Sequence, residues 1–265
     1  MCMVESIGMK VRQSLTHLSY AAGFQLFLFR ETFNFLSKKR TGLRVLIMQI
    51  LFTGVEALSI ISLLSLGIGA VIVIQGAQLP DFLLGDQLYR ILIIVITREL
   101  GPLLTAFVII ARSGSAITTE LGNMVVSHEM EAYLSVGIHP VSQLGVPRLI
   151  GVSLSMVLLT MYSNVFGLLG SLTVSSIITR VRLTDQISAL FSNFHMGDIV
   201  ASITKSLIFG IIIAATSVYY GFSVTGAVTE VPVKTIRSIG VSIVLCILAD
   251  GIIIMLTVLL GAGAL

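Results

Sequence analysis

Four ionisable side chains interrupt stretches of this sequence that are otherwise apolar. Arg98 and Glu99 stand together in the segment ITRELGPLL, while Lys205 and Asp250 lie in two later apolar runs. A charged side chain that faces lipid near the bilayer centre costs on the order of 3 kcal/mol or more. We therefore expect these four groups to face the inside of a helix bundle or a wet cavity. There they can bind a charged substrate, relay ions or pair with one another.

The rise of an α-helix places these charges at a common depth. Arg98 follows Arg90 by eight residues, which corresponds to about 12 Å along a helix axis. The same conversion puts Lys205 about 9 Å and Asp250 about 15 Å from the corresponding ends of their runs. Adjacent residues point about 100° apart on a helix, so Arg98 and Glu99 cannot easily neutralise each other. We expect Lys205 to pair with Glu99, and Asp250 to pair with Arg98.

Gly101 and Pro102 follow the first two charges directly. Proline has no N–H to donate to the carbonyl of Arg98, so the helix should loosen there and leave that carbonyl free. Irregular backbone at membrane depth is tolerated where it lines protein or water. Neighbouring leucines would supply apolar wall: Leu100, Leu103 and Leu104. Two interpretations stay open, because the charges either hold the bundle together or line and gate a substrate cavity.

The sequence lacks the patterns of several other kinds of site. No G-x-x-x-x-G-K-[ST] motif occurs, which excludes nucleotide binding by a P-loop. The histidines have no metal-ligand spacing, and no basic block is dense enough for nucleic acid. Ser113 and Ser115 beside Arg112 suggest an intramembrane serine nucleophile. No histidine lies in a facing span to act as its base, so packing of small residues is the favoured interpretation.

Composition indicates which elements position these residues. The chain has 265 residues, of which 55% are hydrophobic and only 11% charged. An average soluble domain is about 25% charged, so this chain has too little polar surface to cover a soluble core. We predict an all-α integral membrane protein. A spanning helix needs about 20 apolar residues, and five spans fit this length: 57–76, 88–111, 149–171, 199–220 and 239–260.

The N-terminal region is amphipathic rather than uniformly apolar. Apolar residues recur at steps of three and four between residues 14 and 36, which predicts a helix lying in the membrane interface. A short helix is expected at 183–194.

The distribution of Lys and Arg predicts the orientation in the membrane. With a cytoplasmic N-terminus, eleven of the 16 Lys and Arg residues lie on the inner side and three on the outer side. This bias favours that orientation and puts the buried charges in the outer half of the membrane.

The segment between the second and third spans, residues 112–148, is well organised for a membrane loop. Residues 127–137 read as a short helix that Ser127 caps. Gly137 suits the position just after a helix, and Pro140 follows three residues later. A short, sharply ended helix between two spans fits a groove on a soluble partner.

Residues 98–148 resemble the MlaE/YrbE permeases, the membrane subunits of MCE-associated ABC lipid transporters. The shared patterns are R-E-L-G-P from Arg98, A-R-x-G-S-A over residues 111–116, E-x-G-x-M from Glu120, and a helix followed by Pro147 and Arg148. The sequence departs from the family pattern at Val136, where methionine is usual, and at His128, which is often acidic. The segments Thr204–Ser206 and Ala249–Asp250 also match in kind. With the interfacial N-terminal helix, the resemblance covers most of the chain.

The resemblance implies one MlaE-type permease domain over residues 1–265, in a bacterial inner membrane. Such permeases are homodimers that carry a cytoplasmic ABC ATPase, a periplasmic MCE-domain protein and often a STAS-domain protein. The chain would then be no enzyme and hold no metal or cofactor, since the ATPase binds and hydrolyses ATP. Phospholipids or related lipids would move between the inner membrane and the outer envelope.

In this family, residues 127–137 correspond to the coupling helix that contacts the ATPase. The positions implied in that contact are Glu129, Glu131, Tyr133, Gly137 and Pro140. An alternative from another class stays open, namely an ion-coupled secondary carrier that uses the buried charges as a relay. Such a carrier usually needs more spans and an internal repeat.

Overall fold

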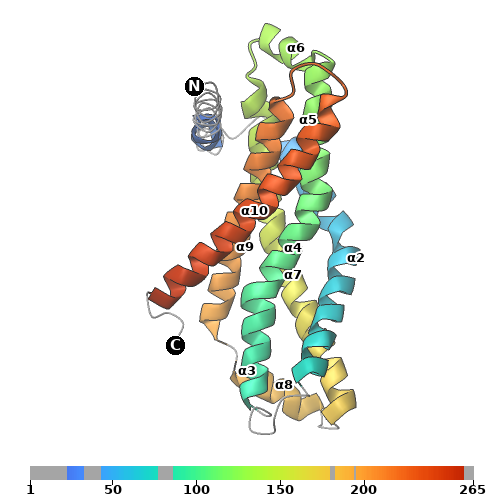
Figure 1. Ribbon diagram of the computed structural model, residues 1–265, viewed down its shortest axis with the longest axis vertical. Coiled ribbons are helices and arrows are strands. Elements are labelled where there is room, and N and C mark those ends of the chain that lie inside the picture. The colour runs from blue at the N-terminus through green and yellow to red at the C-terminus, as the bar shows by residue number, and fades with distance from the viewer. Residues whose placement is uncertain (1–22, 33–42, 77–85, 180–182, 194, 260–265) are drawn as a thin grey trace, which may run out of the picture.

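A computed structural model describes residues 23–32, 43–76, 86–179, 183–193 and 195–259, and every regular element in these ranges is helical (Figure 1). Five helical runs in this part of the chain are long and apolar enough to cross a membrane. They cover Leu46–Gln75, Arg90–Val126, Val141–Ile177, Met196–Phe222 and Glu230–Leu259. The predicted all-α architecture with five spans is therefore confirmed.

The first span is α2 (Leu43–Gly76). The second combines α3 (Asp86–Ile93), the π-helical turn η2 (Ile94–Leu100), α4 (Gly101–Ile109), the π-helical turn η3 (Ile110–Gly114) and α5 (Ser115–Val126). A short α6 (Glu129–Ser135) follows. A third π-helical turn, η4 (Val141–Gly145), leads into α7 (Val146–Thr179), and α8 (Leu183–Ser192) precedes α9 (Met196–Phe222) and α10 (Glu230–Leu259).

The spanning helices extend beyond the predicted spans. Residues 45–56, which precede the first predicted span, belong to the continuous helix α2. The second helix also continues past residue 111 to Val126. Apolar length predicts only the part inside the bilayer, whereas a helix goes on until a residue ends it. Here α5 ends at Ser127, and the backbone turns left-handed at His128.

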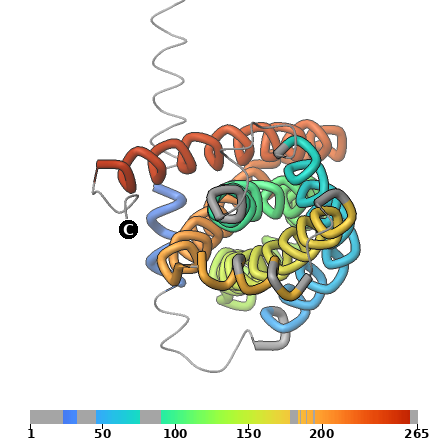
Figure 2. The backbone as a smooth tube through the Cα atoms, turned by 90° about the horizontal axis from the view of Figure 1, so that it is seen from below, coloured from blue at the N-terminus to red at the C-terminus, as the bar shows by residue number. Residues whose placement is uncertain are grey.

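Residues 23–32 form a helix that runs across the bundle rather than along it (Figures 1 and 2). Aromatic contacts hold this helix against its neighbours. The ring of Phe24 lies 5.7 Å from that of Tyr219 and 6.1 Å from that of Phe222, and Phe27 lies 5.1 Å from His139. The placement agrees with an interfacial helix. Residues 14–22 and 33–36 of that prediction lie outside the described residues.

Helices α2 and α7 touch through glycine. A Cβ added to Gly69 would lie 2.0 Å from the carbonyl oxygen of Gly167, and one added to Gly170 would lie 2.5 Å from that of Leu66. Small residues let membrane helices approach this closely. A hydroxyl bridge of 2.8 Å between Ser65 and Ser163 joins the same two helices.

Hydroxyl groups also tie α10 to the bundle at one end. Thr118 of α5 donates to the carbonyl oxygen of Ser217 at 3.1 Å and to Ser238 of α10 at 3.2 Å. Thr216 and Ser242 bridge α9 and α10 at 2.5 Å. From this attached end α10 slants across the bundle (Figure 1), and its outer face is largely exposed.

We expect Gly69→Val to lower the free energy of unfolding by about 1–3 kcal/mol, because the valine side chain would clash with the backbone of α7. Gly67 is the matched control, because a Cβ there meets nothing within 4 Å. Thermal unfolding of both variants in one detergent provides the measurement. Equal stability of Gly69→Val and Gly67→Val would contradict the close contact between α2 and α7.

Candidate functional site

The buried charges meet around one ammonium group. The Nζ of Lys205, on α9, lies 2.5 Å from Oε2 of Glu99 on η2 and 2.8 Å from Oδ1 of Asp250 on α10. Only 1% of the Lys205 side chain is exposed, against 28% for Glu99 and 11% for Asp250. We call these three residues the lysine triad. Their contacts put three helices at one level of the bundle, as the estimated depths indicated.

One of the two predicted pairs is confirmed and the other is wrong. Glu99 pairs with Lys205 as expected, but Asp250 contacts Lys205 instead of Arg98. A lysine ammonium carries three N–H donors, so one group can serve two carboxylates. The Glu99 contact is a hydrogen bond, whereas the Asp250 contact is an ion pair without a directed hydrogen bond onto Oδ1.

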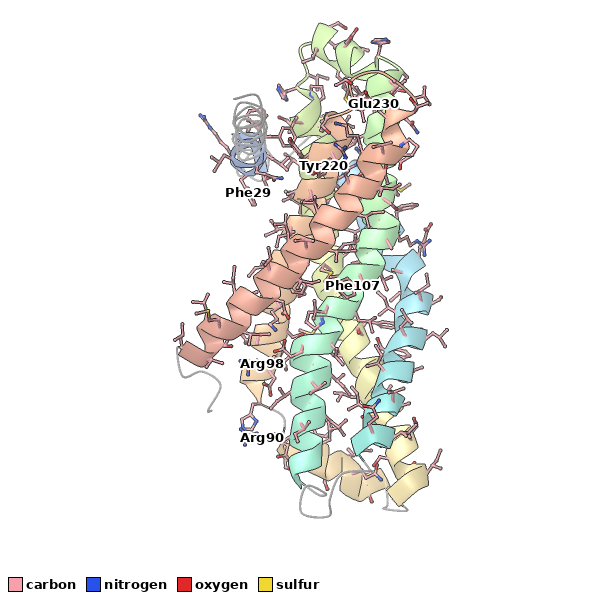
Figure 3. The ribbon with its side chains drawn as sticks, viewed as in Figure 1. Phe29, Arg90, Arg98, Phe107, Tyr220 and Glu230 are labelled. Carbon is pink, nitrogen blue, oxygen red and sulfur yellow. The ribbon has the colours of Figure 1, made fainter. Side chains whose placement is uncertain are left out.

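Arg98 is the remaining charge. It is half-buried and forms no ion pair within the described part of the chain. Figure 3 places it on the long second helix, between Arg90 and Phe107. The lysine triad carries a formal charge of −1 when all three groups are ionised, and Arg98 beside Glu99 brings the sum to zero. Two carboxylates therefore fix the position of the Lys205 ammonium. The N–H donors of Arg98 are not used in an ion pair with any described residue and can bind a ligand.

The irregular backbone predicted at Gly101 and Pro102 is a π-helical turn. The N–H of Gly101 donates to the carbonyl oxygen of Ile96, five residues back, and the wide turn covers Ile94–Leu100. Pro102 then stands in the first turn of α4, where its missing N–H is tolerated. Such turns are frequent at functional sites. Glu99 and Arg98 both project from this turn.

Asn164 of α7 explains why residue 101 is a glycine, and the sequence analysis missed it. A Cβ on Gly101 would lie 2.0 Å from Oδ1 of Asn164. The Nδ2 group of Asn164 donates to Ser202 at 3.0 Å, and Ser202 lies one turn before Lys205 on α9. Asn164 is 6% exposed. A lone asparagine in the apolar run MYSNVFG was the signal available in the sequence.

The expected cavity wall is only partly open. Gly101 and Pro102 are buried, whereas the leucines beside them are half-buried. These are Leu100, Leu103 and Leu104, of which Leu103 packs against the main core. The part of this wall that a ligand can reach therefore consists of leucine side chains.

Comparison with known proteins decides the family. The model of the family described as Permease MlaE matches residues 46–256, which include the whole lysine triad. The chain belongs to the MlaE permease family.

Three relatives show how far this similarity extends. A probable ABC transporter permease protein of Synechocystis sp. is 30% identical over 82% of this permease and 83% of its own length. One of Rickettsia typhi is 26% identical over 68% of this chain and 70% of its own. The chloroplastic protein TRIGALACTOSYLDIACYLGLYCEROL 1 of Arabidopsis thaliana is 29% identical over 75% of this chain and 57% of its own.

The short helix of this MlaE-family permease, α6, ends as the sequence indicated. Gly137 has a φ of 77°, its N–H donates to Leu134, and the N–H of Ile138 donates to Tyr133, each at 3.0 Å. These two bonds form the left-handed helix end that favours glycine. The predicted cap is wrong, because Ser127 closes α5 by donating to the carbonyl oxygen of Asn123.

The residues implied in ATPase contact divide into two groups. Glu129 and Glu131 are exposed, whereas Tyr133 is half-buried against the main core and Pro140 is buried. Sequence analysis missed the apolar residues exposed at the same end, namely Leu134, Val136 and Ile138. Their exposed fractions are 56%, 75% and 41%. The surface of α6 therefore combines two acids with an apolar patch.

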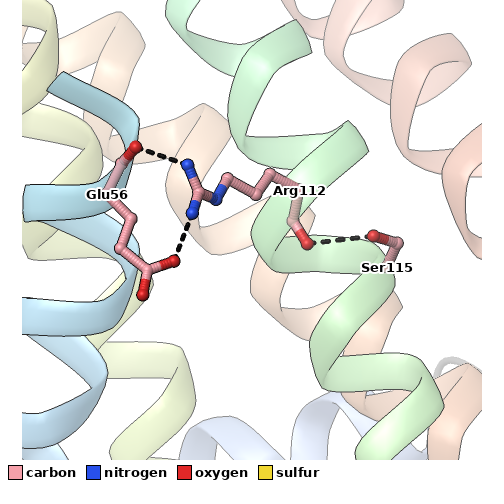
Figure 4. A network of polar contacts seen from close by, with 3 residues as sticks. All are labelled: Glu56, Arg112 and Ser115. Carbon is pink, nitrogen blue, oxygen red and sulfur yellow. Dashed lines mark hydrogen bonds and ion pairs between the residues drawn. The ribbon is translucent and has the colours of Figure 1, made fainter. Parts of the chain in front are cut away.

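Ser115, beside Arg112, bonds to its own helix. Ser115 donates back to the carbonyl oxygen of Ala111 at 2.6 Å. It also donates to that of Arg112 at 2.9 Å (Figure 4). A Cβ on Gly114 would lie 3.1 Å from the hydroxyl of Ser217 on α9. Both observations support the small-residue interpretation over a serine nucleophile.

We expect Lys205→Gln to destabilise the permease by about 3–5 kcal/mol, because it leaves the buried Asp250 and the half-buried Glu99 without their shared cation. Arg98→Gln should change stability by less than about 1 kcal/mol, since Arg98 forms no ion pair with any residue that the structure describes. Unfolding of both variants under identical conditions provides the comparison. A larger loss for Arg98→Gln than for Lys205→Gln would show that the pairing described here is incorrect.

Proposed function

We propose that this chain is the membrane-spanning subunit of an ABC transporter that moves phospholipids or related lipids. The observation that carries the proposal is the lysine triad, with Arg98 beside it, set inside a largely apolar bundle. A lipid has a charged head and apolar tails, so its site needs apolar walls with a few charges at one level. The bundle offers this combination.

The charges have distinct roles in this proposal. Arg98 meets the lipid phosphate, because a guanidinium binds phosphate oxygens through two parallel N–H bonds and no carboxylate of the described residues pairs with Arg98. Glu99 and Asp250 keep Lys205 neutralised while no lipid is present. The exposed parts of Leu100, Leu103 and Leu104 face the acyl chains.

Relatives support both the energy source and the substrate class. The Synechocystis and Rickettsia proteins bear the name of ABC transporter permeases. The Arabidopsis protein is named after a galactosylated diacylglycerol, which is a glycerolipid. We therefore propose that ATP is hydrolysed on a partner ATPase and that a glycerolipid is the cargo.

In the proposed assembly, different partners bind the two ends of the bundle. The helix at residues 23–32 and α6 lie toward the same end (Figure 1), which we propose to be the cytoplasmic end in a bacterial inner membrane. The ATPase would bind the α6 surface there. A second copy of the chain would complete the permease, an MCE-domain protein would contact the opposite end, and a STAS-domain protein would bind the ATPase.

Reconstitution tests the function directly. The permease and its ATPase, placed in vesicles, should move labelled phospholipid only when ATP is hydrolysed, and an ionophore should leave the rate unchanged. Transport that stops with the ionophore and ignores ATP would instead identify an ion-coupled carrier.

In the same vesicles, Arg98→Gln should lower transport at least tenfold while the assembly stays intact, because the lipid phosphate loses the guanidinium that binds it.

The α6 surface gives a separate prediction. We expect Val136→Asp to abolish co-purification of the ATPase, because it puts a charge into the apolar patch that the ATPase would cover. The stability of the permease should not change, since Val136 is 75% exposed. Met196→Asp is the control, since Met196 is 78% exposed at the opposite end of the bundle, against 75% for Val136. Retention of the ATPase by Val136→Asp would place its binding surface elsewhere.

A further inference from the structure

A groove opens on the side of the bundle, between α2 and the second helix. It is lined by Ile60, Phe107, Val108, Ala111 and Arg112. Its volume is about 530 Å³, inside the range of roughly 300–1,000 Å³ of small-molecule sites. Ile60 and Phe107 are 44% and 42% exposed, so the apolar walls are open to the surroundings.

Arg112, a lining residue of the groove, is paired with an opposite charge on α2. The guanidinium of Arg112, on η3, donates to the backbone carbonyl and to the carboxylate of Glu56 on α2 (Figure 4). The side chains of Arg112 and Glu56 remain 34% and 44% exposed. An arginine has five N–H donors, so a ligand can still bind this one. The guanidinium of Arg112 and the carboxylate of Glu56 therefore lie side by side at the apolar groove.

With Arg90 and Gln75 taken as the opposite membrane surface, helical rise places this pair at the surface nearer α6. Arg112 lies 22 residues from Arg90, or about 33 Å, and Glu56 lies 19 residues from Gln75, or about 28 Å. The hydrocarbon core of a bilayer is about 30 Å thick. The pair therefore lies at the headgroup level of the leaflet nearer α6, and the apolar part of the groove extends into that leaflet. Glu99 of the lysine triad is 13 residues away on the same helix, or about 20 Å.

We infer that this groove binds one phospholipid of the leaflet nearer α6, and that it selects a headgroup with a primary ammonium. Arg112 binds the phosphate, Glu56 accepts hydrogen bonds from the ammonium, and an acyl chain lies along Ile60 and Phe107. The charges of the protein pair and of such a headgroup are complementary. A headgroup with phosphate alone would meet the carboxylate of Glu56 without a cation to satisfy it.

The role of this site rests on the proposed function. As part of a lipid transporter, the groove holds lipid at the membrane face nearer α6, about 20 Å along the helix from the lysine triad. Binding itself needs neither ATP nor the ATPase, so it is measured separately from transport.

Tryptophan fluorescence reports occupancy of the groove directly, because the chain contains no tryptophan. Phe107→Trp places a single fluorophore in the groove, which we call the groove reporter. Leu158→Trp, on α7, provides the control reporter, since Leu158 is 56% exposed. Counting from the ion pair of Glu120 and Arg148, Phe107 and Leu158 differ in depth by about 5 Å. Each full-length variant is placed in phosphatidylcholine vesicles that contain a small fraction of one brominated lipid.

We expect brominated phosphatidylethanolamine to quench the groove reporter at least threefold more strongly than the control reporter at equal mole fraction. Brominated phosphatidylglycerol should quench the two reporters equally. Glu56→Gln should remove the preference for phosphatidylethanolamine. Ala111→Phe fills the groove from an exposed position, leaves both charges in place, and should bring quenching of the groove reporter down to that of the control reporter.

Three results would overturn the inference. Equal quenching of the two reporters by phosphatidylethanolamine would show that the groove holds no particular lipid. An equally strong effect of phosphatidylglycerol on the groove reporter would remove the ammonium selectivity. Protection of the groove reporter from both lipids, together with a disulfide between two copies of Ile60→Cys, would show that a second copy of the chain fills the groove. ATP-driven transport by the parent chain would survive each result, so the proposed function is judged separately.

Discussion

The structure depends on neutralising one ammonium group inside an apolar bundle. Lys205 is almost fully buried, and a buried charge without a partner costs several kcal/mol. Two carboxylates from two other helices meet it, Glu99 on η2 and Asp250 on α10. The long second helix, α9 and α10 are therefore tied together at one level. Since α10 exposes most of its outer face, this contact and the hydroxyl bridges near its other end fix its slanted course.

The backbone around Glu99 is adapted to the same requirement. A π-helical turn carries Glu99, and it ends at a glycine whose missing side chain leaves room for Asn164. Asn164 in turn bonds to Ser202, one turn from Lys205. Non-ideal backbone at membrane depth survives where protein covers it, and here α7 provides the cover. The adjacent charges Arg98 and Glu99 are tolerated because one is paired in the interior and the other stays half-buried beside it.

The sequence predicted the parts of this arrangement that depend on local properties. Apolar length is enough to place five spans, and an ionisable residue in such a span must avoid lipid, so Lys205 and Asp250 were found. Pairing is a property of helix packing, which is why Asp250 was assigned to Arg98 instead of Lys205. Helix packing also determines the contact of Asn164 with residue 101 and the contact between Glu56 and Arg112, so the sequence did not indicate them. The sequence also does not show which side of a short segment packs inward, and the structure buries Pro140 and half of Tyr133 while it exposes Glu129 and Glu131.

The most direct test is a double-mutant cycle on Lys205 and Asp250. Stability is measured for the parent, Lys205→Met, Asp250→Asn and the double variant under one condition. Groups in contact couple by about 0.5–3 kcal/mol, whereas distant sites add within about 0.3–0.5 kcal/mol. Our account predicts a coupling of at least about 1 kcal/mol, with the double variant more stable than Lys205→Met alone. Additive losses would show that Asp250 does not neutralise Lys205 and would contradict the central claim.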